Sequence, residues 1–414
     1  MMNYVWLFLI AAAVIVGALT GTIKEVTQSA LDMSGTAVQI ALGLIGIMTL
    51  WLGMMKIAEA AGLIRLLARA ITPISRRLFP DIPADHPAIG SMMLNIAANW
   101  LGLGNAATPF GIKAMQQLQE LNPDKETATN AMIMFLALNT ASITLVPMTI
   151  IGVRTSLGSS APGAIIGPTI FASTMATVAA IVAVKFFSFF AQRDKNVPNS
   201  SLFSWRGVLI VAAILTLLVF GIFSGMLQKL AAVVPFSFKS VISFISTWTI
   251  PFLLLMIPVL AVFKRVQVYE VFVEGAKEGF QVAVRIIPFL VAILAAIAMF
   301  RASGAMDFFT SLLSPVTNLI GLPAEILPAA LMRPLSGSGT LGIITELLET
   351  HSPDSFIGYL ASTIYGCTET TFYVIAVYFG AVGIKKTRFA VPAGLFADVA
   401  GVLAALFICR LLFG

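Results

Sequence analysis

Apolar runs close to the length that crosses a lipid bilayer dominate this sequence of 414 residues. A membrane-spanning helix needs about 20 predominantly apolar residues, because each residue adds only about 1.5 Å of rise. The runs that meet this length are residues 3–20, 36–58, 128–152, 164–190, 207–229, 243–263, 282–300, 355–380 and 389–412. We therefore predict an all-α, polytopic transmembrane protein.

Composition excludes a soluble protein of this size. Hydrophobic residues make up 58% of the chain and charged residues only 11%. A soluble domain carries about a quarter charged residues, because its surface faces water. A chain with so few charges cannot cover such a surface, and the length of the apolar runs does not fit an enlarged soluble core.

The chain has a net charge of +6, and its basic residues cluster between the apolar runs. Clusters of this kind are typical of cytoplasmic loops and of helix ends beside anionic lipid. We therefore expect the lipid bilayer as a partner and no nucleic acid. The first apolar run lacks a preceding basic segment, so we expect a retained membrane helix rather than a cleaved signal peptide.

Residues for metal binding or catalysis are scarce. The chain has two cysteines, Cys367 and Cys409, and two histidines, His86 and His351. This is too few for a dedicated zinc or iron–sulfur centre. The sequence also lacks a phosphate-binding loop, a His-Glu-x-x-His motif and a nucleophile elbow. We expect no enzymatic activity, no metal centre and no cofactor.

Two parts of the chain repeat the same order of landmarks. In each part, an amphipathic segment precedes an apolar stretch that Gly, Pro and small polar residues interrupt, at 102–109 and at 333–340. A short helix ending near a proline and a long helix follow, and the long helices are expected at 128–152 and 355–380. We predict two related halves, 1–190 and 206–414, joined by the polar linker 191–205.

Duplicated halves with broken or re-entrant helices at corresponding positions are the sequence sign of a secondary transporter. Irregular backbone at membrane depth is tolerated only where it is buried in protein or lines a wet cavity. The repeats are inverted if each unit crosses the membrane an odd number of times, which the sequence leaves open. Residues 60–79 and 266–281 are amphipathic and suit the membrane interface, although the second also fits an ordinary cytoplasmic helix.

Polar residues cluster at these interruptions. Amides and hydroxyls are uncharged donors and acceptors, so they suit a small polar solute or ion between the two broken regions. They also suit hydrogen bonds between membrane helices, and for a single residue both interpretations stay open. The candidate binding residues are Asn99, Asn105, Thr108, Asn139 and Ser142 from the first half, and Arg333, Ser336, Ser338, Thr368 and Glu369 from the second.

Charged residues within apolar stretches are the sharpest signals. Arg333 and Glu369 either form a structural clasp or bind a ligand, because an unpaired charge is costly in the membrane. Asp398 is either a coupling-ion ligand or a partner of Arg301 or Arg333. Arg154, Arg285 and Arg301 lie near expected span ends, where snorkelling explains them.

Six motifs carry a family resemblance: 51–59 (Trp-Leu-Gly-Met-Met-Lys-Ile-Ala-Glu), 77–80 (Arg-Leu-Phe-Pro), 101–109 (Leu-Gly-Leu-Gly-Asn-Ala-Ala-Thr-Pro), 274–279 (Glu-Gly-Ala-Lys-Glu-Gly), 333–337 (Arg-Pro-Leu-Ser-Gly) and 377–386 (Val-Tyr-Phe-Gly-Ala-Val-Gly-Ile-Lys-Lys). They resemble the spore maturation proteins A and B, joined in one polypeptide. Residues 1–190 are similar to protein A and residues 205–414 to protein B.

That family belongs to the Gate, or nucleoside-recognition, group, which is similar in pattern to ferrous-iron permeases and concentrative nucleoside transporters. The resemblance implies a multi-pass protein of the bacterial cytoplasmic membrane. Only Cys367 offers a soft ligand at a break, which disfavours iron. We predict a transporter or permease for a small polar solute or ion. The alternative is a non-transporting membrane scaffold or assembly factor of the spore-maturation type, and a homo-oligomer fits either function.

Overall fold

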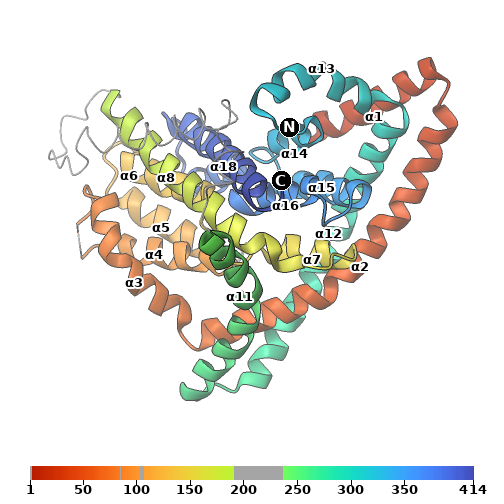
Figure 1. The fold of residues 1–414 in the computed structure, drawn as a ribbon. Helices are drawn as coiled ribbons and strands as arrows, with labels where there is room; N and C mark the ends of the chain where they lie inside the picture. Colours follow the sequence, from red (N-terminus) through yellow and green to blue (C-terminus); the bar gives the residue numbers. More distant parts are fainter. Residues whose placement is uncertain (1, 84, 103–106, 191–235) are drawn as a thin grey trace.

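The computed structural model describes residues 2–83, 85–102, 107–190 and 236–414 (Figure 1). The linker expected at 191–205 and the span expected at 207–229 lie outside these ranges. Within them the chain is helical and has no strands, apart from an isolated bridge between Thr127 and Lys386. The polytopic all-α prediction is thereby confirmed.

The elements of the first half are α1 (Met2–Thr20), α2 (Ile23–Ala60), α3 (Leu63–Leu78), α4 (Pro87–Trp100), α5 (Thr108–Glu120), α6 (Asn130–Thr140), α7 (Met148–Ser156), η2 (Pro162–Ile165) and α8 (Ile166–Phe190). Those of the second half are α11 (Phe236–Phe263), α12 (Val268–Ala302), α13 (Ala305–Ile320), η3 (Ala324–Ile326), α14 (Leu327–Met332), α15 (Gly337–His351), α16 (Phe356–Cys367), α17 (Thr371–Gly380) and α18 (Ala390–Phe413).

Six of the described helices are long and apolar enough to cross a membrane. They are α1, α2, α8 with the preceding η2, α11, α12 and α18. Large apolar side chains point outward from several of them, and Leu19 and Phe263 are more than four-fifths exposed. An apolar outer surface is stable in lipid and costly in water, so these helices make the chain a multi-pass membrane protein.

The order of elements repeats along the chain. The series α2 to α8 and the series α12 to α18 each consist of a very long helix, a 16-residue amphipathic helix, two broken helices and a final span. Equivalent helices run antiparallel. Phe171 of α8 stacks on Phe407 of α18, and Phe187 lies against Phe389 at the other end. Inverted repeats would produce such antiparallel pairs, and the inversion of the two halves stays a prediction.

The α2–α12 pair is also antiparallel and lies along one edge of the molecule (Figure 1). Two glycines of α12 face the α2 backbone. A Cβ atom on Gly275 would lie 2.5 Å from the carbonyl oxygen of Leu52, and one on Gly279 would lie 2.6 Å from that of Met48. Small residues allow this close approach, which supplies van der Waals contact between membrane helices.

The interruptions predicted at 102–109 and 333–340 are present. Helix α4 ends at Trp100 before α5 begins at Thr108, and α14 ends at Met332 before α15 begins at Gly337. The amphipathic segment 60–79 forms α3, as predicted. Residues 266–281, in contrast, form no separate interfacial helix, because α12 runs unbroken from Val268 to Ala302.

The prediction of one long helix at 128–152 and another at 355–380 is wrong, because each of these segments is broken into two helices. Helix α6 ends at Thr140 and α7 begins at Met148, after Pro147, which has no backbone N–H to continue a helix. Helix α16 ends at Cys367, and α17 begins at Thr371 after extended backbone at Thr368 and Thr370. Threonine is β-branched and favours extended backbone over helix.

Candidate functional site

Four breaks in helices approach one another inside the protein. We number them in chain order: break 1 between α4 and α5 (101–107), break 2 between α6 and α7 (141–147), break 3 between α14 and α15 (333–336) and break 4 between α16 and α17 (368–370). Residues 103–106 of break 1 lie outside the described residues, so nothing is assigned to Asn105. We call the region where the four breaks meet the junction.

Each half ties its own two breaks together by one backbone hydrogen bond. The Leu145 amide donates to the Trp100 carbonyl at 3.0 Å in the first half. The Phe372 amide donates to the Pro334 carbonyl at 3.0 Å in the second. Broken helices leave backbone groups without intrahelical partners, and burial makes unpaired groups costly. The breaks therefore satisfy part of each other's hydrogen bonding.

A third backbone bond joins the halves. The Glu369 amide in break 4 donates to the carbonyl of Thr140, the last residue of α6, at 2.7 Å. The stretches 102–109 and 333–340 are thus linked through the breaks that the sequence did not reveal. Gly102 shows how tight the packing is, because it has φ +71° and its Cβ would lie 2.7 Å from the Val146 carbonyl oxygen.

An amide cluster fills the first-half side of the junction. Asn99 donates through its Nδ2 to Oδ1 of Asn139 at 2.9 Å. The Tyr378 hydroxyl, from α17 of the other half, donates to the same Oδ1 at 3.3 Å and accepts from Nδ2 of Asn95 at 3.1 Å. The Tyr378 ring stacks on Phe135, with centroids 5.9 Å apart. Two predicted residues, Asn99 and Asn139, therefore meet, and Tyr378 is a central residue that the sequence analysis missed.

Arg333 crosses from break 3 to break 4. Its side chain is buried, and its guanidinium donates to the carbonyl of Thr368 and lies over the Tyr365 ring, 4.6 Å from the centroid. The carboxylate of Glu369 is 3.9 Å from Nη2, and its side chain is 49% exposed. The geometry fits a clasp between the breaks, held mainly by the Thr368 carbonyl, whereas most of the Glu369 carboxylate stays accessible.

The remaining predicted residues have separate positions. Ser336 is the N-cap of α15 and accepts from the Gly339 amide at 3.1 Å, so its hydroxyl serves the helix. Ser338 is exposed, with its oxygen 3.4 Å from that of Ser336. Ser142 is buried within break 2, and Thr108 is the first residue of α5.

Asp398 lies beside break 4 but pairs with neither suggested arginine by hydrogen bond. Its Oδ2 accepts from the Thr371 hydroxyl at 2.6 Å. Arg301 instead contacts Glu346 of α15, with 2.5 Å from Nε to Oε1. Glu346 is buried and was missed, because it lies in an apolar helix without a neighbouring motif.

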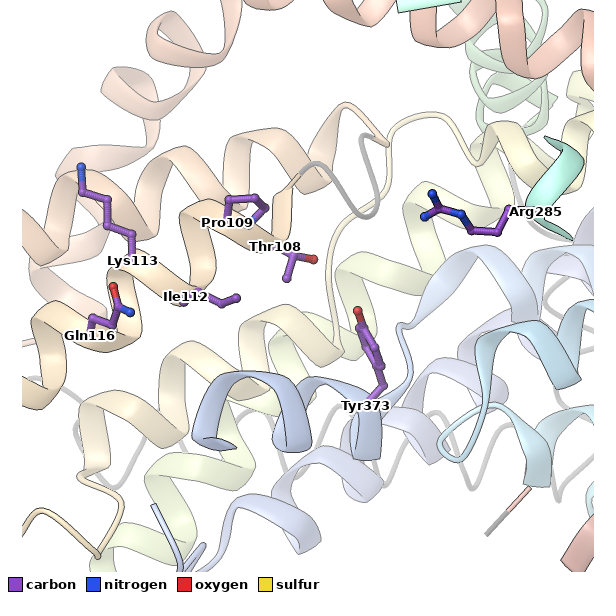
Figure 2. Close-up of a pocket in the computed structure, with 7 residues that line it drawn as sticks. All are labelled: Thr108, Pro109, Ile112, Lys113, Gln116, Arg285 and Tyr373. Carbon is purple, nitrogen blue, oxygen red and sulfur yellow. The ribbon is translucent and has the colours of Figure 1, made fainter. Parts of the chain in front are cut away.

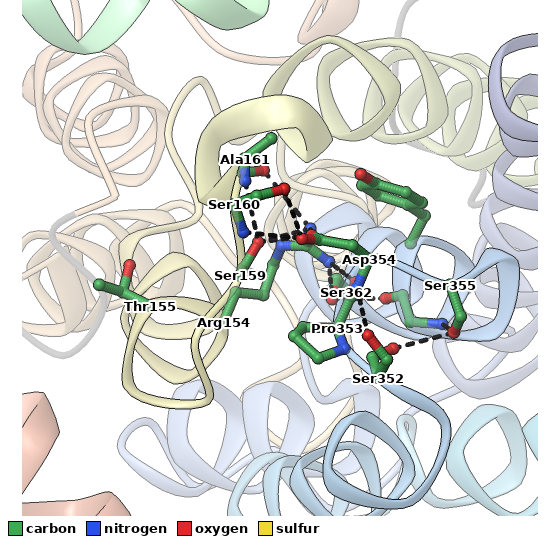
Figure 3. Close-up of polar contacts among 12 residues, drawn as sticks. Arg154, Thr155, Ser159, Ser160, Ala161, Ser352, Pro353, Asp354, Ser355 and Ser362 are labelled. Carbon is green, nitrogen blue, oxygen red and sulfur yellow. Dashed lines mark hydrogen bonds and ion pairs between the residues drawn. The ribbon is translucent and has the colours of Figure 1, made fainter.

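Arg154 is fully buried, so snorkelling does not describe it (Figure 3). Its guanidinium donates to the Pro353 carbonyl at 2.5 Å and to Asp354 Oδ1 at 2.8 Å. Ser159 and Ser160 donate to the same carboxylate. Burial alone would raise the pKa of Asp354, but these hydrogen bonds and the Arg154 charge lower it below its usual value.

The Asp354 cluster joins the loop after α7 to the loop before α16. The equivalent pair of loops, the loop after α17 and the loop before α6, is also joined. Lys385 pairs with Glu126 at 2.6 Å, and Arg388 donates to the Ala128 carbonyl at 3.1 Å. The halves are therefore tied at both ends, by loops in equivalent places, while the junction lies between these ties.

Several buried polar atoms at the junction have no hydrogen-bond partner among the described residues. They are Oδ1 of Asn95, Oγ1 of Thr140, Nε of Arg333 and Oδ1 of Asp398. Buried polar groups are nearly always paired with protein or water. Water or a polar solute at the junction would supply the missing partners of these four atoms.

An open pocket of about 720 Å³ lies beside the junction (Figure 2). Its lining comes from α5, α12 and α17: Thr108, Pro109, Ile112, Lys113, Gln116, Arg285 and Tyr373. Thr108 follows break 1 directly, and Tyr373 lies in the first turn after break 4. The pocket is therefore bordered by one break from each half. Among the described residues, no group of three or more His, Cys, Asp or Glu side chains is placed to hold a metal ion.

Comparison with known proteins agrees with these features. The model of the Gate family, described as nucleoside recognition, matches residues 41–193 and 283–385, well over half of the chain. Spore maturation protein B of Bacillus subtilis (strain 168) is 51% identical over 174 residues, which cover 42% of this chain and 98% of that protein. Spore maturation protein A of the same strain is 42% identical over 187 residues, covering 45% and 95%. The chain belongs to the Gate family and is similar to spore maturation proteins A and B fused in one polypeptide.

Proposed function

We propose that this chain is a permease that carries a small polar solute or ion across the bacterial cytoplasmic membrane, with its site at the junction. The observation that carries the proposal is the hydrogen bond from the Glu369 amide to the Thr140 carbonyl. It joins broken helices from the two halves, beside unpaired buried polar atoms and an open pocket. The chain acts without an enzymatic step or a nucleic-acid partner.

Physical chemistry supports a ligand site at such a place. Helix ends carry partial charges, so they bind polar groups without burying full ions. Irregular backbone at membrane depth is stable where it lines a cavity. In transporters built from repeats, the substrate lies between the repeats, and one repeat moves against the other. The description of the family makes nucleosides one natural solute to include in a test.

A second function, a non-transporting scaffold, is favoured by one observation. Asn99, Asn139 and Tyr378 form a continuous hydrogen-bonded cluster between the halves. Such a cluster holds the halves together, and a protein that serves only as an assembly platform needs no motion between them. The names of the spore maturation relatives fit an assembly role as well as a transport role.

Uptake by purified protein in proteoliposomes tests the permease. The panel contains labelled nucleosides, amino acids, carboxylates and divalent cations. We expect uptake of at least one class above protein-free vesicles, and loss of that uptake in the Asn139→Leu variant. The matched control is Asn318→Leu, because Asn318 is exposed at the end of α13. Absence of uptake for every class, in protein that is folded and correctly reconstituted, would favour the scaffold.

A further inference from the structure

Arg285 occupies an unusual position in the fold. It lies at the midpoint of α12, where the part of the helix that carries Glu270, Glu274, Lys277 and Glu278 gives way to the apolar run 286–300. Its side chain is exposed and lines the pocket. It has no hydrogen bond or ion pair with any described residue. The sequence analysis placed Arg285 near the end of the span expected at 282–300, and its position beside the charged part of α12 agrees with that.

An arginine at the border of an apolar run needs polar surroundings for its charge, because an unpaired charge in lipid is costly. Figure 2 shows the Arg285 side chain directed across the pocket toward Thr108, with the Tyr373 hydroxyl facing the same space. The pocket thus supplies the polar surroundings that the guanidinium needs, and it leaves the charge free for a ligand.

The rest of the lining has the same electrostatic sign. Lys113 adds a second cation, and Thr108, Gln116 and Tyr373 add hydrogen-bond donors. None of the described residues that line the pocket is Asp or Glu. Helices α5 and α17 both begin at the pocket, and in the part of the chain that the structure describes no side chain caps either N-terminus. Helix N-termini attract negative charge.

We propose that the pocket binds the carboxylate or phosphate group of a small organic anion, with Arg285 as the residue that selects for negative charge. This deepens the proposed function and rests on it, because it names the class of solute. A volume of about 720 Å³ is within the range of small-molecule sites. The guanidinium suits both groups, because its planar fork matches their oxygen pairs.

Binding by the purified protein tests this assignment with probes matched in size. One pair is uridine and uridine 5′-monophosphate, and the other is succinamide and succinate. Each probe is titrated while the melting temperature is followed, since a ligand that binds the folded state raises it. We expect the anion of at least one pair to stabilise the protein and its neutral partner to do so at least about tenfold more weakly in apparent affinity.

Substitutions in α12 test whether Arg285 is responsible for the preference for the anion. Arg285→Gln is expected to remove the preference for the anion, Arg285→Lys to retain part of it, and Lys277→Gln to leave it unchanged. Lys277 is an exposed cation on the same helix, so this control removes the same charge elsewhere on α12. If Arg285→Gln fails to fold, the comparison of Arg285→Lys with Lys277→Gln carries the test, because only the first is expected to weaken binding.

The outcomes separate this assignment from the permease proposal. Uptake of neutral solutes alone, an anion effect that persists in Arg285→Gln, or no effect of any soluble anion would overturn the anion site. Of these, the first leaves the permease standing. Stabilisation by phosphatidylglycerol in nanodiscs, but by no soluble anion, would show that Arg285 holds a lipid headgroup and would also overturn the assignment. Anion binding without uptake of any solute would support the site and contradict the permease.

Discussion

The backbone amide of Glu369 donates a 2.7 Å hydrogen bond to the carbonyl of Thr140, and this contact joins a broken helix of one half to a broken helix of the other. Neither residue needs its side chain for the bond. The contact therefore depends on where the two helices are interrupted, and it positions the Glu369 side chain at the edge of the junction, where it is half exposed.

Arg333 and Glu369 are expected to contribute very unequally to stability. Replacing Arg333 by Met leaves the Thr368 carbonyl without its guanidinium partner, which should cost about 1–3 kcal/mol. Replacing Glu369 by Gln should cost less than about 0.5 kcal/mol, because its carboxylate is exposed and 3.9 Å from Arg333. Thermal unfolding of both variants in one detergent measures the difference. Equal losses would mean that the ion pair, rather than the carbonyl contact, holds the clasp.

The Tyr378 hydroxyl is expected to stabilise the contact between the halves. Tyr378→Phe keeps the ring stacked on Phe135 but removes the hydrogen bonds with Asn95 and Asn139. The expected loss is about 1 kcal/mol, since bonds between membrane helices are modest. Tyr373→Phe is the control, because its hydroxyl faces the pocket. A melting temperature equal to that of the wild type would show that water replaces the hydroxyl at no cost.

Asp354 should make stability depend on acid pH. Its pKa is lower in the folded protein than in an exposed carboxyl, so its ion pair and hydrogen bonds contribute fully above about pH 4. The contribution is lost as the pH falls through the folded pKa. Asp354→Asn should therefore lower the melting temperature at pH 7 and narrow the gap to the wild type as the solution is acidified. Asp307→Asn, an exposed carboxylate on α13, serves as control, and a gap that stays constant with pH would contradict the assignment.

Because α2 and α12 pack closely, a larger side chain at Gly279 is expected to destabilise the protein strongly. Gly279→Leu must push the α2 backbone away, because even a Cβ atom would lie 2.6 Å from the Met48 carbonyl oxygen. Overpacking of this kind costs about 1–3 kcal/mol or more. Gly46→Leu is the control, since nothing lies within 4 Å of a Cβ built there. Equal melting temperatures for the two variants would mean that the helices are not in contact at Gly279.

The interruptions that could be predicted are those that sequence chemistry marks clearly. Glycines and a proline lie around break 1, and Arg333-Pro334 precedes a glycine-rich turn at break 3, so helix breakers reveal both. Break 2 was missed because five of its seven residues are apolar, so that it resembles part of a span. Pro147 and the β-branched residues before it were the available signal.

The partners of the charged residues were harder to predict than the breaks. Arg154 meets Asp354 and Arg301 meets Glu346 across long stretches of sequence, and nothing local indicates either pair. Asn99 and Asn139 were predicted to belong to one site and do meet. Tyr378 was overlooked because a tyrosine in an apolar helix is usually part of the core, and only the packing of α17 against the first half brings it to the amides.

The central claim is that water has access to the junction, although the protein around it is largely apolar. Thiol labelling measures this accessibility most directly. Cys367 and Cys409 are fully buried, and both are first replaced by Ala. Single Thr108→Cys, Glu369→Cys and Thr340→Cys variants are then treated in proteoliposomes with a membrane-impermeant methanethiosulfonate. We predict rapid modification at positions 108 and 369, one from each half, and none at the fully buried position 340. Positions 108 and 369 as unreactive as position 340 would contradict the account.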